Sequence, residues 1–168
     1  PHLFRNDYTS GKPRGFTLLV RPTQEEFNAF VLILDKMLSD NIDISFFMDE
    51  VAREVDHERK DGKIEVRQKG TISMLDEWIW TRARPHDKKP FVEMVMAFKK
   101  VRSLRQKPAH ALKPDIFDHK FFHDQQHLLI NTYKGLQSLR LLFSSHPRVK
   151  ATPPKTPEVL VGGPIWTQ

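Results

Sequence analysis

The longest run of helical periodicity in the chain extends from about His119 to Ser145. A helix of this length, roughly seven turns, can bury its apolar face only by packing along several other helices. Asp118 stands where a helix-capping residue is expected. The pattern therefore predicts a helical bundle with a long C-terminal helix. Its buried stripe is expected to contain Phe122, Leu128, Leu129, Thr132, Leu136, Leu139 and Phe143.

Four shorter helices are expected before it, which gives an all-α bundle of about five helices. The first begins at a capping box, in which Thr23 caps the helix and Glu26 reaches back to the cap amide. Thr71 or Ser73 is expected to cap the third helix, and Pro90 to open the fourth. The expected spans are Gln24 to Leu38, Ser45 to about His57, Ile72 to Arg82, and Phe91 to about Gln106.

The 168 residues suffice for one domain with a full apolar core. We expect an irregular N-terminal arm over residues 1–22, with a short strand at Phe16 to Val20, and a helical domain over residues 23–147. Within that domain, the turn signal Asp61-Gly62 precedes the alternating segment Lys63 to Arg67, which predicts one strand of a small β-ribbon. Residues 148–168 contain four prolines and are expected to form an extended Pro-rich tail.

Composition excludes several functional classes. The chain has no cysteine, which rules out a disulfide framework, thiol catalysis and thiolate metal sites and suits a reducing cytoplasm. No apolar run approaches the ~20 residues of a membrane span.

His119, His123 and His127 form a row on one straight helix, which cannot easily surround an ion, so we expect surface histidines there. No metal or cofactor is predicted.

Basic residues are concentrated between Lys99 and Lys113, where six of the fifteen residues are Lys or Arg and none is acidic. The chain as a whole carries a net charge of +6, so this window alone could account for the excess. A local basic surplus favours an anionic partner such as RNA. Residues expected to bind backbone phosphates without reading sequence are Lys99, Lys100, Arg102, Lys107 and Lys113. The alternative is that this charge run is only a solvated helix face.

Within the same window, Arg105 is followed by four residues and then His110, in the order Arg-Gln-Lys-Pro-Ala-His. This segment and the helices that flank it, about residues 90 to 146, resemble the HEPN superfamily, in which an arginine near a helix end precedes a polar residue and a histidine. Gln106 stands where Asn, Asp or His is more usual, and Pro108 is a departure inside the motif. The resemblance implies a homodimer in which two motifs meet, and a metal-independent endoribonuclease, with an antitoxin or other protein as a further partner.

The chemistry of RNA cleavage fits these residue types. Attack by the 2'-hydroxyl requires proton transfer and stabilisation of a charged phosphorane. His110 could move protons near neutral pH, Arg105 could hold the phosphate, and Gln106 could orient them, which would leave 2',3'-cyclic phosphate ends. Two alternatives stay open. Arg105 could simply cap its helix, with His110 in a loop, and the chain could be a catalytically inactive binding or dimerisation module of a larger protein.

Overall fold

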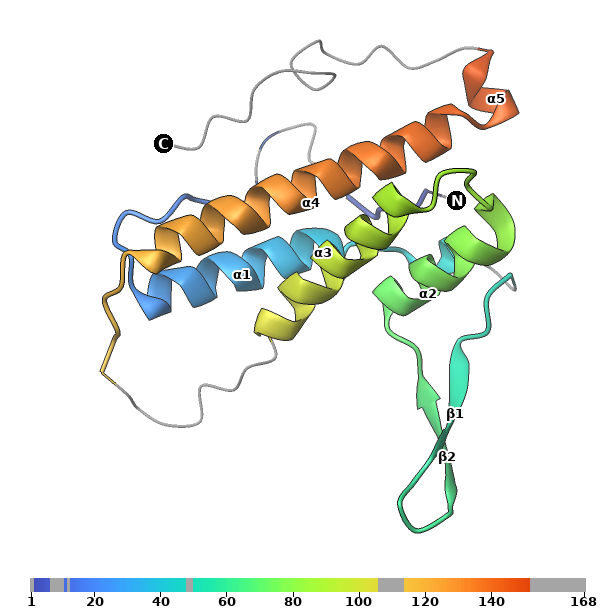
Figure 1. The fold of residues 1–168 in the computed structure, drawn as a ribbon, viewed down its shortest axis with the longest axis horizontal. Helices are drawn as coiled ribbons and strands as arrows, with labels where there is room; N and C mark the ends of the chain where they lie inside the picture. The colour runs from blue at the N-terminus through green and yellow to red at the C-terminus, as the bar shows by residue number, and fades with distance from the viewer. Residues whose placement is uncertain (1, 7–10, 12, 48–49, 106–113, 152–168) are drawn as a thin grey trace.

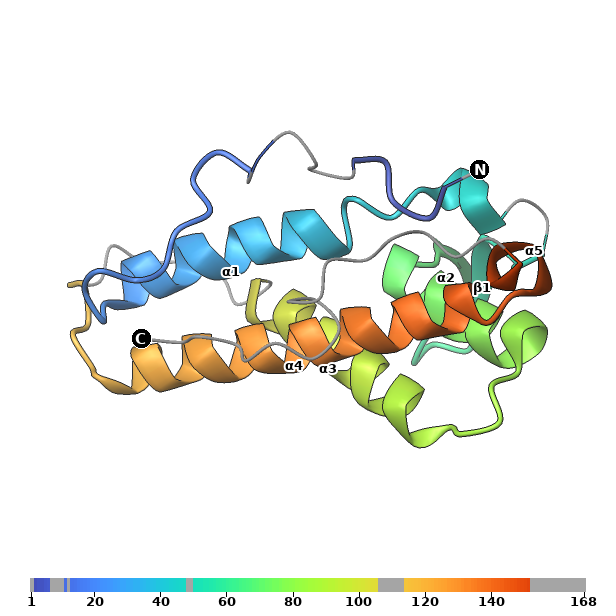
Figure 2. The same cartoon turned by 90° about the horizontal axis from the view of Figure 1, so that it is seen from above.

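The computed structural model describes residues 2–6, 11, 13–47, 50–105 and 114–151. They form a mostly helical body with one two-stranded antiparallel sheet. Helices α1 (Gln24–Leu38) and α4 (Lys120–Ser144) lie side by side, and α3 (Lys89–Arg105) crosses and packs on both (Figures 1 and 2). The predicted helical bundle is therefore present, although the chain as a whole is not purely α-helical.

The core lies where these three helices meet. Each contributes one apolar stripe at helical spacing, and the innermost residues have almost no exposed surface. Gly135 of α4 lets α3 approach closely, since a Cβ at this position would lie 3.0 Å from Met94 Cγ. The principal core residues are Phe30, Val31 and Leu34 of α1, Met94, Phe98 and Val101 of α3, and Leu128 and Leu139 of α4.

Helix α1 has the predicted bounds and half of the predicted capping box. The hydroxyl oxygen of Thr23 accepts a hydrogen bond from the amide of Glu26 at 3.3 Å. The carboxylate of Glu26 does not return to the cap amide but accepts the amides of Val20 and Arg21, both at 2.9 Å. The N-terminal arm is thereby tied to α1. The strand expected at Phe16 to Val20 is absent from this described part of the arm.

The helix expected from Ser45 to about His57 was a wrong prediction. A short 3₁₀ helix, η1 (Ile44–Phe47), stands at its start, and strand β1 (Glu54–Glu58) occupies its end. Phe47 and Val51 are buried as expected, but Val55 is 47% exposed on the strand. The segment forms a strand because it pairs with the strand that follows it. Its helical spacing of apolar residues involved only a few positions, which was too weak a signal to predict a helix.

The predicted ribbon is confirmed. Strand β2 (Ile64–Gln68) pairs antiparallel with β1, with Asp56 opposite Val66. Gly62 adopts a φ of 77° in the connecting turn, a conformation that glycine takes without strain. The turn is closed by hydrogen bonds between Arg59 and Gly62 and between Arg59 and Lys63. In Figure 1 this hairpin stands away from the helices.

The third helix begins one residue earlier than expected, as α2 (Thr71–Trp78), and continues into the π-helical segment η2 (Ile79–Ala83). Neither predicted cap holds, because Gly70 is the N-cap residue. The hydroxyl of Thr71 instead donates to the carbonyl oxygen of Ser39 at 2.6 Å. This bond fastens the start of α2 to the end of α1.

The last two long helices lie close to their predicted spans. Helix α3 begins at Lys89, so Pro90 lies inside its first turn, where proline is tolerated. The N-cap residue of α4 is His119, but the carboxylate of Asp118 accepts the amide of Lys120 at 2.9 Å and so caps from one position earlier. In the α4 stripe, Phe121 rather than Phe122 is buried, stacked on Phe27 with ring centroids 5.3 Å apart.

The start of α4 is also joined to the start of α1. Thr23 and Phe117 form an isolated antiparallel bridge. The amide of Gln24 donates to the carbonyl oxygen of Ile116, and that of Asp118 to Pro22, both at 2.9 Å. At the opposite end of α4, a short helix, α5 (Pro147–Lys150), forms where the irregular tail was expected to begin. Residues 152–168 of that tail lie outside the described residues.

Candidate functional site

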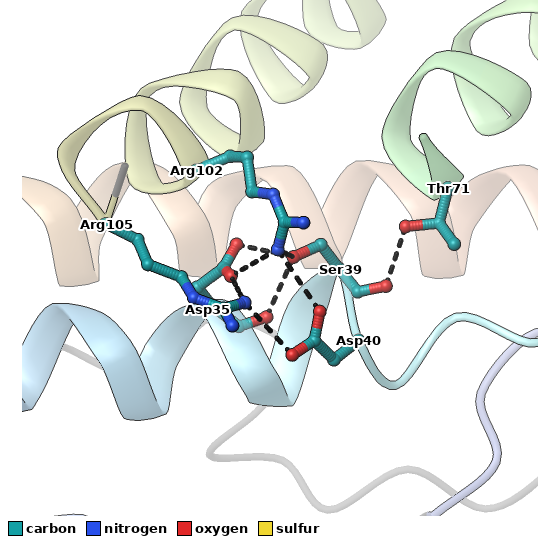
Figure 3. Close-up of polar contacts among 6 residues, drawn as sticks. All are labelled: Asp35, Ser39, Asp40, Thr71, Arg102 and Arg105. Atoms are coloured by element: carbon teal, nitrogen blue, oxygen red, sulfur yellow. Dashed lines mark hydrogen bonds and ion pairs between the residues drawn. The ribbon is translucent and has the colours of Figure 1, made fainter. Parts of the chain in front are cut away.

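The C-terminal end of α3 carries a compact cluster of charges. Arg102 and Arg105 are three residues apart and therefore share one face of the helix. Both point at the C-terminal end of α1 and its next residues (Figure 3). The Nη1 atom of Arg102 lies 2.7 Å from Asp35 Oδ2 and 3.2 Å from Asp40 Oδ1. Arg105 Nη1 binds the same Asp35 oxygen and lies 3.0 Å from Asp40 Oδ2.

Asp35 is the centre of this cluster, and only 1% of its side-chain surface is exposed. A buried carboxylate is tolerated only when cations and hydrogen-bond donors surround it. Here two guanidinium groups bind one oxygen, and the hydroxyl of Ser39 donates to the other. Asp40 lies at the rim with 43% of its side chain exposed. We call Asp35, Asp40, Arg102 and Arg105 the α1–α3 charge cluster.

The electrostatics of the cluster keep Arg105 charged. The hydrogen bond to Asp35 raises the pKa of its guanidinium above the ordinary value, burial opposes this, and attraction to Asp40 adds to the rise. A phosphate that bound this guanidinium would compete with two carboxylates already in contact with it. In this arrangement Arg105 holds the end of α3 against α1 through its ion pairs with Asp35 and Asp40.

The other predicted site residues fall in three places. The ammonium of Lys99 pairs with Asp76 of α2 at 2.7 Å. Lys100 is exposed on α3 and lines the groove described below. The remaining predicted residues, Gln106, Lys107, His110 and Lys113, lie outside the described residues. The structure therefore brings Arg102 and Arg105 together on Asp35 and Asp40, whereas Lys99 pairs with Asp76 and Lys100 lines the groove.

A groove of about 800 Å³ runs between α3 and α4. Its floor is apolar and closes where Gly135 meets Met94. Lys100 on one wall and Lys134 on the other are both exposed. The groove is also lined by the neutral polar side chains of Ser103, Asn131 and Ser138. The hydroxyls of Ser103 and Ser138 donate to the carbonyl oxygens of Lys100 and Lys134, so of the three side chains only the amide of Asn131 has donors left for a ligand.

Of the polar groove residues named above, sequence reasoning predicted only Lys100. Lys134, Asn131 and Ser138 carry no local motif, so only the packing of α3 on α4 reveals them. The role of Asp35 could have been inferred from the sequence, because this residue stands four positions after Val31 on the buried stripe of α1. A carboxylate at such a position requires a buried cation, and the sequence offered arginines on α3.

The histidine row on α4 lies apart from both features. His119 contacts the aromatic rings of Phe117 and Phe122, with centroid distances of 5.3 and 6.4 Å. Within the described ranges, no group of three or more His, Cys, Asp or Glu side chains is placed to hold a metal ion. Over the same ranges no helix has both the length and the apolar character needed to cross a membrane.

Comparison of the chain with protein-family models, with curated proteins and with solved structures finds no match. Assignment of a function therefore depends on the residues and their geometry. The resemblance to the HEPN superfamily rests on the segment from Arg105 to His110, of which Arg105 is the one residue that the structure describes.

Proposed function

We propose that this domain binds RNA along the groove between α3 and α4, through contacts to backbone phosphates. The observation that carries the proposal is the placement of Lys100 and Lys134, two exposed ammonium groups on facing walls of one groove. Cations on both sides of a groove can follow a phosphate backbone without reading its sequence. The local basic excess of the window from Lys99 to Lys113 adds to the attraction.

The lining of the groove suits a single strand. The apolar side chains of Met96, which is exposed, and Ala97 can contact base faces. The side-chain amide of Asn131 can bind phosphate or ribose oxygens. Glu93 also lines one end of the groove, where it repels an anion. The proposed phosphate path therefore runs along the part that contains Lys100 and Lys134.

In this proposal the α1–α3 charge cluster is structural. Arg102 and Arg105 hold the end of α3 on α1, and Lys99 holds its middle on α2 through Asp76. These pairs fix the direction of α3 and so set the width of the groove. Of the four basic residues of the window that the structure describes, Lys99, Arg102 and Arg105 thereby position α3, and Lys100 remains available to a ligand.

A second candidate function, metal-independent RNA cleavage by Arg105 and His110, is supported by one feature. The Arg105 side chain keeps 30% of its surface exposed at the end of α3, directly before the segment that contains His110. A guanidinium presents five N–H donors in a planar fork, so a phosphate could bind donors that face solvent. His110 would then act as the proton-transferring group.

Binding is tested by fluorescence anisotropy with a labelled single-stranded RNA at several salt concentrations. The Lys100→Ala/Lys134→Ala double variant should bind about tenfold or more weakly, and its salt dependence should have a slope smaller by about 1.4, which corresponds to two lost phosphate contacts at about 0.7 each. The matched control is Lys36→Ala/Lys60→Ala, which removes two exposed lysines outside the groove. Equal losses in both variants would contradict a groove-specific site.

Cleavage is tested separately with the same RNA in EDTA, using wild-type protein and the His110→Ala variant. The binding proposal expects intact RNA with both proteins at micromolar concentration. Cleavage by wild type alone, with 2',3'-cyclic phosphate and 5'-hydroxyl ends, would instead establish the second candidate. Cleavage by both proteins would point to a contaminating nuclease and would contradict a role for His110.

A further inference from the structure

The β1–β2 hairpin is the most exposed ordered element of the described chain. Every residue of both strands is solvent-exposed, including Ile64 at 70%, Val66 at 57% and Val55 at 47%. Among the described residues, neither outer edge of this two-stranded sheet pairs with a third strand. Such a hairpin is marginally stable alone in water, and its free edges are templates for another strand.

The hydrogen-bond pattern shows which groups each edge offers. The amide of Arg59 donates to the carbonyl of Lys63, and that of Lys69 to Arg53, both at 2.8 Å. These two pairs are hydrogen-bonded positions, and in an antiparallel ladder such positions recur at every second residue. Along β2, residues 65 and 67 therefore face β1. The amides and carbonyls of Ile64, Val66 and Gln68 face outward.

We propose that two copies of this chain associate through their β2 edges, in antiparallel register about a two-fold axis at Val66. In this register Val66 lies opposite Val66 of the second copy, and Ile64 lies opposite Gln68. These are the residues whose backbone groups face outward, so each of the three opposed pairs can exchange two hydrogen bonds. The result is a continuous four-stranded sheet with the isologous symmetry that homodimers favour.

The side chains of β2 match this register. Glu65 lies opposite Arg67 of the second copy, and Arg67 lies opposite Glu65, so both cross-strand pairs join opposite charges. Within one chain, Glu65 and Arg67 already form an ion pair of 3.0 Å on the same face. Across the dimer axis, four alternating charges would form a closed network. The neighbouring two-fold registers would place Glu65 opposite Glu65, or Arg67 opposite Arg67, and are disfavoured.

Beyond the strand, Lys63 would lie opposite Lys69 of the second copy, which is a like-charge pair. The ammonium of Lys69 is however already paired with Glu77 and has only 16% of its side chain exposed, which reduces this repulsion. The exposed apolar residues favour association, because Ile64 and Val66 share one face of the strand and would adjoin Val66 and Ile64 of the second copy. Four β-branched side chains would then cover one another in the centre of the sheet.

The other edge of the hairpin does not offer the same match. Pairing β1 with itself about Asp56 would place Asp56 opposite Asp56 and Glu54 opposite Glu58. Acidic side chains on an exposed edge are a common protection against strand addition. One edge is therefore self-complementary and the other self-repelling, which limits the association to two copies and prevents an extended sheet.

The test uses proline substitutions on the two edges and sedimentation equilibrium of the full chain without RNA. Proline removes one backbone amide, and at Val66 and Asp56 that amide faces outward, so the hairpin keeps its own ladder. Val66→Pro should raise the dimer dissociation constant about tenfold or more, because two central hydrogen bonds are lost. Asp56→Pro makes the same change on the other edge and should leave the dissociation constant within about twofold.

Charge exchange provides the second arm. Glu65→Arg places arginines opposite one another and should weaken the dimer, and the Glu65→Arg/Arg67→Glu double variant should restore it. A wild-type chain that stays monomeric at millimolar concentration would overturn the proposal, as would a dimer that Asp56→Pro weakens as much as Val66→Pro does. Since no RNA is present, either result is independent of the groove proposal.

Discussion

The α1–α3 charge cluster allows a quantitative test of what burial does to an ion pair. Asp35 and Asp40 bind the same two arginines, but the side chain of Asp35 is 1% exposed and that of Asp40 is 43% exposed. Replacement of each by asparagine removes one negative charge and preserves the side-chain shape. The two variants differ chiefly in the burial of the group that is changed.

For Asp35→Asn we expect the free energy of unfolding to fall by about 3 kcal/mol. Two hydrogen bonds from guanidinium groups lose their charged acceptor, and each is worth about 1.5–3 kcal/mol as a bond between charged groups. Breaking a buried pair typically costs about 3–5 kcal/mol, but Arg102 and Arg105 are 38% and 30% exposed and can be partly hydrated, which favours the lower end. For Asp40→Asn the expected loss is at most about 1 kcal/mol.

The measurement is urea unfolding followed by tryptophan fluorescence, with a thermal scan as a second readout. A loss of 3 kcal/mol corresponds to a fall in Tm of about 6–12 °C for a chain of this size. In a double-variant cycle, Arg102→Ala/Arg105→Ala should cost more than the sum of the single changes, because only the pair of changes leaves Asp35 without a cation. Equal effects of Asp35→Asn and Asp40→Asn would refute the reasoning.

Two further predictions concern other contacts. Gly135→Ala should lower the free energy of unfolding, measured by urea unfolding, by about 1 kcal/mol. The new Cβ would lie 3.0 Å from Met94 Cγ and 3.3 Å from Met94 Cα, and the cost of this overpacking should exceed the gain in helix propensity. A more stable variant would contradict the close contact between α3 and α4. The pKa of Glu26 is lowered chiefly by hydrogen bonding from Arg21, so its stabilisation is present above the ordinary glutamate pKa of about 4.3 and is lost as the pH falls through the lowered value. Glu26→Gln should therefore show a smaller loss of stability over that acidic range, and an unchanged acid profile would argue against these arm contacts.

The sequence predicted the elements that long periodic patterns specify. Helices α1 and α4 were found because their buried residues recur over four or more turns, and β2 because a glycine turn precedes its alternation. The segment from Ser45 to His57 was misassigned because Val51 and Val55 are four residues apart, a spacing typical of one helix face. In the molecule, Val51 belongs to the core and Val55 to a hairpin whose partner strand follows it.

The candidate site was less accessible to sequence reasoning. The concentration of basic residues was visible, but their partners were not, because Asp35 is 67 residues from Arg102 and 70 from Arg105. Without those carboxylates, each arginine was interpreted as a phosphate ligand. Lys134 was missed for a related reason, because a single lysine on an exposed helix face gains meaning only when α3 is packed beside α4.

The contacts of α1 also fix the two described ends of the connection between α3 and α4. Arg105 is held near one end of α1 by Asp35 and Asp40, and residues 115–118 are bonded to Pro22, Thr23, Gln24 and Glu25 at the other end. Helix α1 therefore holds these two points at a fixed distance from each other. The 15 residues of α1 span about 22 Å. Adding or removing one turn of α1 would therefore change the distance between the two ends of the connection by about 5 Å, although the sequence of the connection itself stayed unchanged.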